Sequence, residues 1–460
     1  MKARTKERLK PIVRRVVPER VLGAAWRRWD ARRSRVEPMV EARPFDPAVG
    51  AEILARAREN LRATAGAQLA IDAGERWQFF LDRIRRDVEG FQTVREAIAY
   101  AQSAVDFDHR DDAAAFEPWA AHSLVLLRHE YPQFENEIYT AADSEWSRPS
   151  TQLRIGGRPV SNITYYHLRY ALTSLSYRSD IRSVFEIGGG YGAPARMWKL
   201  TAGVDRYAVA DFPECLFFAE VFLRANFPDA DLLYVREPGD AARAADADFV
   251  LCPIEHVESL KGVHFDLAVN TGSLPEMTEE WVDFWMDYLD AADVSLFYSL
   301  NYFGQPLEYM AEAMNAWSPR PHPRWAARLL RAEPYFVLTQ TTRVFAETMY
   351  EKGESADVET ANRAFELYDH RVFDVQCMLE QMDAVRVSCD AGQMWRLLER
   401  MMQQLGWVPT EAYWLAEQLA KNGAGGADRD RLSAYTKRLR SIRSTGNEGY
   451  VARVGPPVGD

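Results

Sequence analysis

The sequence predicts an α/β protein whose central sheet is mostly parallel. Five short apolar segments follow one another after residue 180, and helical stretches separate them. The segments are Val184–Ile187, Tyr207–Ala210, Phe249–Pro253, Phe265–Asn270 and Val294–Leu300. Continuously apolar strands that alternate with helices are typical of a parallel sheet covered on both faces. A glycine-rich turn over residues 188–192, directly after the first segment, favours the same architecture.

Composition places the chain among ordinary globular proteins. It has 460 residues, of which 47% are apolar and 27% charged, and this length allows two or three domains. Its four cysteines, Cys215, Cys252, Cys377 and Cys389, lack CxxC spacing, which disfavours a cysteine zinc site and a disulfide scaffold. No apolar run approaches the roughly 18 residues that a membrane span needs, and no apolar segment follows the basic N-terminus as in a signal peptide. We therefore expect a cytoplasmic protein.

The N-terminus is basic, whereas the remainder is acidic. Residues 1–36 carry 13 Lys or Arg and three acidic residues, although the net charge of the whole chain is −11. An acidic body predicts no nucleic-acid partner, because phosphate neutralisation dominates that affinity. Pro18 and Pro38 bound a predicted basic amphipathic helix within residues 1–40, and its apolar face holds Val21, Leu22, Ala25, Trp26, Trp29 and Val36. Residues 18–36 either contact an anionic membrane surface or form a solvated helix that docks its tryptophans on the body.

Helical periodicity predicts an N-terminal helical region over residues 41–150. Its helices cover Ala51–Gly66, Arg76–Val88, Val94–Ala104 and Trp119–Glu130. In the second of these, apolar residues recur at helical spacing from Trp77 to Val88. An additional apolar-faced helix over residues 164–178 precedes the first strand.

The predicted sheet domain covers residues 151–350. Helices over Glu214–Asn226 and Glu279–Ala291 separate its strands, and Tyr335–Val344 supplies the closing strands. A C-terminal helical region then extends over 351–443, with a linker at Asn422–Asp428 and a flexible tail at 444–460. The broad, Met-rich apolar face of these last helices either caps the active site, forms a homodimer interface or packs internally.

The strongest motif is the glycine loop. The strand ending at Ile187 leads into Gly188-Gly189-Gly190-Tyr191-Gly192, and a helix follows over Pro194–Leu200. Glycines allow a sharp turn and close approach of a ligand, and the helix N-terminus offers free N–H groups. Gly188, Gly190 and Ala193 also fit the G-x-G-x-x-A pattern of dinucleotide-binding loops. Glu186 separates the two interpretations, because a carboxylate there disfavours a pyrophosphate and favours a ligand with an ammonium and a sulfonium.

Two further strand ends suggest a nucleoside site. Asp211 ends the second strand and predicts an acceptor for ribose hydroxyls. The alternative role of Asp211 is a helix N-cap, since Pro213 suits the first helical turn. Ile254 and Glu255 follow the third strand, where an adenine ring would lie, and His256 is interpreted as structural or as a contact at the adenine edge.

Four motifs together resemble the sugar O-methyltransferases of bacterial polysaccharide and glycoside biosynthesis. They are Glu186–Gly192, Asp211–Pro213, Asn270–Met277 and Phe297–Asn301, and the resemblance covers about residues 160–350. That family is similar to the class I S-adenosylmethionine (SAM)-dependent methyltransferases. The resemblance implies a Rossmann-like, mostly parallel sheet of the seven-stranded type, SAM as cofactor and methyl transfer to a sugar hydroxyl of a glycan, nucleotide sugar or glycosylated metabolite. The cofactor-binding residues are then Glu186, Gly188, Gly190, Tyr191, Gly192, Asp211, Phe212, Ile254, Glu255, Asn270 and Thr271.

The methyl acceptor is expected beyond the fourth and fifth strands. Ser273 is predicted to contact the substrate, and Asn301 either contacts it or caps a turn. A sugar hydroxyl is a poor nucleophile, so a general base is expected, and Glu276 and His167 are the candidates. Their alternative roles are an acid at the start of the helix that follows, and a structural histidine on a helix face.

Neighbouring signals are weaker. The eight histidines are scattered and predict no metal site, although a carboxylate-bound ion leaves little linear signature. Trp281, Trp285 and Tyr288 lie on one helix face and either pack on the sheet or form a sugar-stacking platform.

Two rival functions are a nicotinamide-dependent oxidoreductase and a catalytically inactive SAM-binding scaffold or partner subunit. Glu186 argues against the first rival. The intact glycine loop and Asp211 argue against loss of cofactor binding, although not against loss of catalysis.

Overall fold

The computed structural model describes residues 36–37, 47–66, 71, 75–104, 123–124, 127–128, 130–147, 153–155, 157–160, 162–302, 324–332, 345–353 and 395–396. The predicted membrane-contacting segment, apart from its last residue, and the tail lie outside these residues. So do the linker, almost all of the C-terminal helical region and the predicted closing strands at 335–344. Within the described part of the chain, no helix combines the length and apolarity needed to cross a bilayer.

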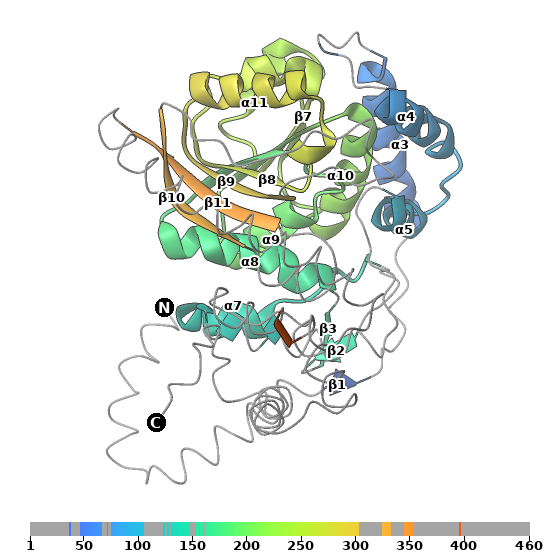
Figure 1. Ribbon diagram of the computed structural model, residues 1–460. Helices are drawn as coiled ribbons and strands as arrows, with labels where there is room; N and C mark the ends of the chain where they lie inside the picture. Colours follow the sequence, from blue (N-terminus) through green and yellow to red (C-terminus); the bar gives the residue numbers. More distant parts are fainter. Residues whose placement is uncertain are drawn as a thin grey trace, which may run out of the picture.

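An eight-stranded sheet forms the centre of the molecule (Figure 1). Its strands are β4 (Ser183–Ile187), β5 (Arg206–Asp211), β6 (Leu232–Tyr234), β7 (Phe249–Pro253), β8 (Phe265–Thr271), β9 (Val294–Tyr302), β10 (Trp325–Ala332) and β11 (Phe345–Lys352). The order across the sheet is β10-β11-β9-β8-β4-β5-β7-β6. All pairs from β9 to β6 are parallel, whereas β11 runs antiparallel to both β9 and β10.

This order confirms the predicted fold class, an α/β fold with a Rossmann-like, mostly parallel sheet. The first five predicted strands correspond to β4, β5, β7, β8 and β9. The short edge strand β6 was not predicted, because it has only three residues and these show no clear periodicity. The closing strands occupy 325–332 and 345–352, on either side of the predicted Tyr335–Val344.

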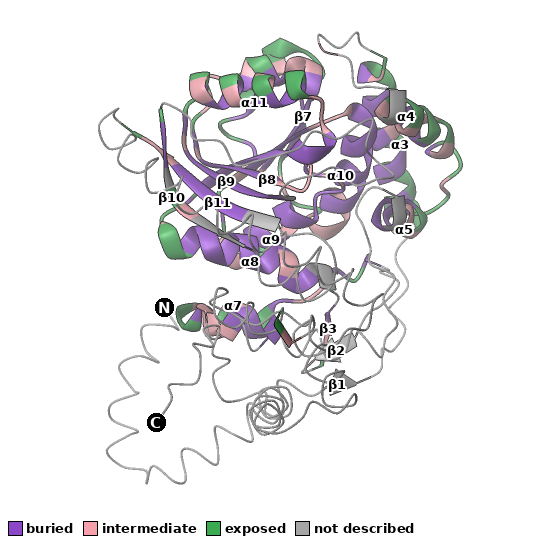
Figure 2. Cartoon of the chain, viewed as in Figure 1, coloured by how far each residue is buried: buried purple, intermediate pink, exposed green. Residues whose placement is uncertain are grey.

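Helices cover both faces of the sheet, as its apolar strands require. On one face lie α8 (Asn162–Tyr177), α9 (Ala193–Ala202) and α10 (Pro213–Asn226). The other face is covered by α11 (Glu279–Ala291) and the 3-10 helices η2 (Pro238–Arg243) and η3 (Ile254–Leu260). Figure 1 shows α11 on the side opposite α8 and α9, and Figure 2 shows that the strands between them are almost entirely buried.

The N-terminal helices belong to the same core. α3 (Pro47–Thr64), α4 (Glu75–Asp87) and α5 (Val94–Ala104) form where helical periodicity predicted them, and they gather beside α10 (Figure 1). Asn60 of α3 donates to the buried carboxylate of Glu220 on α10 at 2.7 Å and accepts from Arg236 at 2.7 Å. A buried polar network of this kind specifies how the two helices dock.

A short helix and a small second sheet precede α8. η1 (Pro132–Phe134) continues into α7 (Glu135–Thr140), and β2 (Leu153–Ile155) pairs with β3 (Arg158–Val160). β1 (Val36–Glu37) pairs antiparallel with β2. The expectation that Val36 lies on the face of an N-terminal helix is therefore wrong, because strand pairing determines its conformation. Residues 123–124, 127–128 and 130 are helical, in agreement with the helix predicted over Trp119–Glu130.

A buried ion pair attaches the reversed strand β11 to helix α8. The fully buried carboxylate of Glu347 accepts hydrogen bonds from Arg169, Thr173 and Tyr298 at 2.8–2.9 Å. A buried charge is tolerated when its partners satisfy it, and removing one partner is costly. This cluster therefore determines where β11 inserts beside β9.

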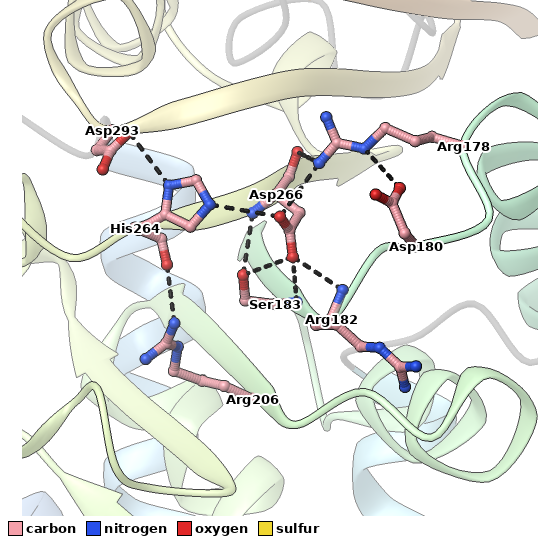
Figure 3. Close-up of polar contacts among 8 residues, drawn as sticks. All are labelled: Arg178, Asp180, Arg182, Ser183, Arg206, His264, Asp266 and Asp293. Carbon is pink, nitrogen blue, oxygen red and sulfur yellow. Dashed lines mark hydrogen bonds and ion pairs between the residues drawn. The ribbon is translucent and has the colours of Figure 1, made fainter.

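Asp266, near the start of β8, joins this strand to residues 178–183 at the amino-terminal edge of the sheet (Figure 3). Its carboxylate accepts from the backbone N–H groups of Arg182 and Ser183, each at 2.8 Å, and from Arg178 Nη2 at 3.1 Å. His264 lies between Asp266 and Asp293, at 3.3 and 3.2 Å. Burial on its own raises the pKa of Asp266, but these hydrogen bonds outweigh it and hold the pKa below its ordinary value.

We expect Asp266→Asn to lower the free energy of unfolding by about 1–3 kcal/mol at neutral pH, because a neutral amide offers a single oxygen to the donors that the charged carboxylate satisfies. A carboxylate with a lowered native pKa stabilises the fold above its ordinary pKa, and that contribution is lost as pH falls through the native pKa. The difference between wild type and variant should therefore shrink in acid. Urea unfolding measured at pH 7 and then at successively lower pH, down to about pH 2 and thus below the ordinary carboxyl pKa of about 3.9, follows this loss.

The matched control is Asp293→Asn, whose side chain is 62% exposed. It should change the free energy of unfolding by less than about 0.5 kcal/mol. Equal stability of Asp266→Asn and wild type at pH 7 would contradict this account of the amino-terminal edge.

Candidate cofactor and active site

The parallel strands bring the predicted site residues to one edge of the sheet. Because β9, β8, β4, β5 and β7 are neighbours and run in the same direction, the loops after them meet at their carboxyl ends. The order changes direction at β4, which lies between β5 and β8. In open α/β sheets a ligand binds outside the strand ends at such a switch point.

The glycine loop after β4 is tightly packed at this switch point. Gly188, Gly190 and Gly192 have positive φ angles of 71°, 55° and 84°, which suit glycine best. A Cβ atom on Gly188 would lie 2.8 Å from Ser273 Cβ. One on Gly189 would lie 2.5 Å from Val209 Cγ1 and 2.8 Å from Glu186 Oε2. Only glycine therefore fits at positions 188 and 189. Helix α9 begins directly after the loop, at Ala193.

Glu186 lies beneath this loop. Its side chain is 1% exposed, on the face of β4 that α8, α9 and α10 cover, and its carboxylate oxygen is a close neighbour of Gly189. Burial, together with the charge and hydrogen bond of Glu186, raises the pKa of Tyr207 well above its ordinary value. The backbone of the glycine loop therefore lies between Glu186 and a ligand bound above it. Glu186 would act on such a ligand electrostatically.

Asp211 fastens the glycine loop to β5. Its Oδ2 accepts from the Gly190 N–H at 3.0 Å and its Oδ1 from the Phe212 N–H at 2.7 Å. Burial raises the pKa of Asp211 to about 6, although these backbone bonds act in the opposite direction. Phe212, half-buried, is the N-cap residue of α10 and has no side-chain cap bond. Asp211 therefore precedes the capping position, and its carboxylate lies beside the loop.

Several predicted ligand contacts use their side chains within the fold. Tyr191 is 2% exposed, and its hydroxyl accepts from Gln102 of α5 at 3.3 Å while its ring packs on Phe222. The amide of Asn270 donates to the Ile187 carbonyl at 2.9 Å and accepts from the Leu274 N–H at 3.3 Å. These residues shape the loops after β4 and β8.

Other predicted residues differ in how much of them is accessible at this edge. Ser273 also donates to the Ile187 carbonyl, at 3.3 Å. Thr271 is half-buried at the end of β8, and Ile254 is 7% exposed at the start of η3. His256 is half-buried in η3. Its backbone carbonyl accepts a hydrogen bond from the Ser259 hydroxyl at 2.6 Å, so its backbone has a structural role.

An acidic group extends the site beyond β5 and β7. The pKa of Glu255 is raised to about 7, mainly because the side chain is buried, and the charge of Glu214 raises this pKa further. Glu214 is buried and forms an ion pair with Arg85 of α4. Oε2 of each glutamate is buried and has no hydrogen-bond partner among the described residues. Perturbed, incompletely satisfied carboxylates are typical of binding sites.

Sequence reasoning missed Glu214 and Arg85. In the sequence, Glu214 looks like an ordinary acid in the first turn of a helix. Arg85 lies 129 residues away in another predicted helix. Only the docking of α4 brings them together.

The two candidate bases lie in different surroundings. Glu276 ends η4 (Leu274–Glu276) and is 8% exposed. Thr278 caps α11 by accepting from the Trp281 N–H at 3.4 Å, and Glu279 and Glu280 supply its acidic first turn, so Glu276 is not needed to start that helix. His167 is 5% exposed beside aromatic rings of α8, and burial lowers its pKa to about 3. A neutral histidine of such low basicity accepts a proton poorly.

Asn301 is fully buried near the end of β9. Its Nδ2 donates to Ser299 at 2.6 Å, whereas its Oδ1 has no partner among the described residues. Such an acceptor is costly to bury unless something binds it.

The aromatic residues of α11 face the sheet. Trp281, Trp285 and Tyr288 are at most 5% exposed, and the Tyr288 ring stacks on Phe185 at 5.4 Å between ring centroids. This confirms packing on the sheet over a sugar-stacking platform. Within the described ranges, no group of three or more His, Cys, Asp or Glu is arranged to hold a metal ion.

Comparisons with known proteins give distant structural matches. No protein-family model matches the sequence, and no curated protein matches it significantly. Among solved structures, EvdMO1 aligns over 41% of this chain and 41% of its own, at 15% identity and a TM-score of 0.26. The N-terminal domain of EvdMO1 with S-adenosylhomocysteine (SAH) bound aligns over 49% of this chain and 97% of its own, at 13% identity and a TM-score of 0.28.

A third solved structure, the mitomycin 7-O-methyltransferase MmcR, aligns over 67% of this chain and 74% of its own, at 12% identity and a TM-score of 0.28. TM-scores this low carry no argument about function. The fold assignment therefore rests on the strand order, and the interpretation of the site rests on its geometry.

We expect Gly189→Ala to destabilise the protein by about 1–3 kcal/mol, because the new methyl group overlaps Val209 and Glu186. Adding Val209→Ala removes one of the two overlaps and should restore part of the loss. Gly262→Ala is the matched control, since a Cβ there meets nothing within 4 Å. Chemical unfolding of the four proteins measures these differences, and a Gly189→Ala variant as stable as wild type would contradict the packing of the loop.

Proposed function

We propose that the protein is a SAM-dependent O-methyltransferase that transfers a methyl group to a sugar hydroxyl of a glycan, nucleotide sugar or glycosylated metabolite. The acceptor class rests on the resemblance of Asn270–Met277 and Phe297–Asn301 to sugar O-methyltransferases. The cofactor class rests on the site itself.

The observation that carries the cofactor proposal is the acidic surrounding of the glycine loop. Glu186 lies beneath the loop, Asp211 is bonded to it, and Glu214 and Glu255 follow the next strand ends. Carboxyl groups on several sides of the loop disfavour the pyrophosphate of a nicotinamide cofactor, because each of them that ionises repels it. They favour a ligand whose reacting end carries an ammonium and a sulfonium, with a nucleoside at the other end.

The residues fit such a ligand in two parts. The backbone of Gly188–Gly192 would border the amino-acid end, with the charge of Glu186 below it. Asp211 has lone pairs left beside its two backbone bonds and would accept ribose hydroxyls. Oε2 of Glu255 would accept the exocyclic amine of the base, next to Ile254. Bound SAM supplies an electrophilic methyl group on its sulfonium.

The contribution of the chain to the reaction is alignment and proton removal. In-line transfer needs the acceptor oxygen held close to the methyl group. Thr271, Ser273 and Asn301 lie at or near the ends of β8 and β9. The Oδ1 of Asn301, which has no partner among the described residues, would accept a substrate hydroxyl. We assign the general base to Glu276, because the low pKa of His167 makes that residue the weaker candidate.

The same fold could also serve as an inactive SAM-binding scaffold or partner subunit. Activity that appears only with a second polypeptide would favour this candidate. Homodimer formation and contact of residues 18–36 with anionic membranes remain proposals from the sequence.

The function is tested by calorimetric titration of the full chain with SAM, SAH and NADH. We expect binding of the two sulfur nucleosides in about the micromolar range and none of NADH. Asp211→Ala should weaken SAH binding about tenfold or more while the protein stays folded. Binding of NADH alone would overturn the proposal, and methyl transfer from labelled SAM to a panel of sugar acceptors then tests the acceptor class.

Glu276→Gln separates the role of base from that of structure. If Glu276 removes the proton, turnover should fall about 10²- to 10⁴-fold, while the affinity for SAH changes less than about threefold. Glu280→Gln, an exposed acid in the first turn of α11, is the matched control and should keep full activity. A fully active Glu276→Gln variant would end its candidacy as the base.

A further inference from the structure

Helix α4 extends from a fixed end across the carboxyl edge of the sheet. At its C-terminal end, Arg58 of α3 donates to the Val88 carbonyl at 2.9–3.0 Å and to the Phe91 carbonyl at 2.6 Å. Ile84 and Val88 are buried in the core that α10 shares. The position of α4 is therefore determined by the body of the protein.

One stripe of α4 contacts the loops of the candidate cofactor site. Trp77, Leu81 and Arg85 are spaced by four residues and thus lie close to one helix face. Trp77 Nε1 donates to the Glu276 carbonyl at 3.0 Å, and its ring lies 5.9 Å from that of Phe212, tilted by 35°. Arg85 pairs with Glu214, and Leu81 between them is 2% exposed.

These contacts span the glycine loop. Phe212 follows β5 and Glu276 follows β8, the two strands that flank β4. Trp77 therefore connects the loops on either side of the loop that begins at Gly188. The indole of Trp77 is half-buried and adds a flat apolar surface beside Phe212. Phe212 directly follows Asp211, the residue proposed to bind the ribose.

We propose that Trp77 is a cofactor-site residue, and that α4 forms the outer wall of the adenosyl half of the site. This inference rests on the proposed function and adds a contact from outside the sheet domain. The indole and Phe212 together offer aromatic surface to the flat face of a purine, which is neutral and stacks well. The Arg85–Glu214 ion pair holds the helix two turns further along.

The test compares SAH binding by full-length wild type, Trp77→Ala, Trp77→Phe and Phe79→Ala. Removing a stacked aromatic ring should weaken SAH and adenosine alike by about tenfold or more. Trp77→Phe keeps a ring and loses the N–H, so its loss should be smaller. Phe79 lies on the same helix but is 68% exposed, and Phe79→Ala should bind within about twofold of wild type.

A spectroscopic readout distinguishes contact from a merely structural role. If the purine packs on Trp77, SAH quenches part of the tryptophan fluorescence of wild type, and this part disappears in Trp77→Phe. Thermal unfolding without ligand identifies any variant that fails to fold. If Trp77→Ala fails to fold, SAH binding is compared between wild type and Trp77→Phe.

The outcomes separate the two proposals. Wild type that binds SAH while Trp77→Ala binds it equally well overturns the role of Trp77 alone. Tighter binding by Trp77→Ala also overturns it, because Trp77 would then obstruct the site. Wild type that does not bind SAH overturns the proposed function, and the inference with it.

Discussion

The candidate site depends on the absence of side chains at Gly188 and Gly189. Between them, Ser273, Val209 and Glu186 leave no room for a Cβ atom at either position. The loop can therefore lie close over β4 and β5, where Asp211 holds its backbone from one side. Because the loop is fixed, α9 starts at a defined place and the ends of β5 and β8 approach a common point. Every residue assigned to the cofactor is positioned relative to this contact.

Carboxylates have different surroundings at the two edges of the sheet. At the amino-terminal edge, Asp266 accepts hydrogen bonds from Arg178, Arg182 and Ser183 (Figure 3). At the carboxyl edge, Glu214, Glu255 and Asn301 each keep a buried oxygen without a partner among the described residues. Buried polar groups are normally paired, and a ligand bound at the carboxyl edge would supply partners for these oxygens.

Sequence alone predicted much of the sheet and its helices, because apolar strands and amphipathic helices leave clear periodicities. It missed β6, since three residues show no period. The closing strands at 325–332 and 345–352 flank the segment predicted for them, which lies outside the described residues. Sequence reasoning located the site residues along the chain better than it assigned their roles. Nothing in a linear pattern tells that the Tyr191 ring turns into the core, or that the Asn270 amide bonds the neighbouring strand.

Long-range contacts were the hardest to foresee. Trp77 and Glu276 are separated by 199 residues, and helical periodicity reports only that Trp77 lies on the apolar face. The choice between core and site for such a residue depends on which loops the helix meets. That information comes from the docking of whole elements.

The docking of α3 and α5 on α10 determines which parts of the chain fold together. Glu220 of α10 is fully buried because Asn60 and Arg224 satisfy its carboxylate, and Phe217 and Phe218 pack on Phe91. A fragment that begins at residue 151 would contain the entire sheet, yet it would expose this carboxylate and an aromatic patch to water. The minimal cooperative unit of the protein thus includes helices far upstream of the glycine loop, and shortening the chain to its motif-bearing part would favour aggregation over a smaller folded protein.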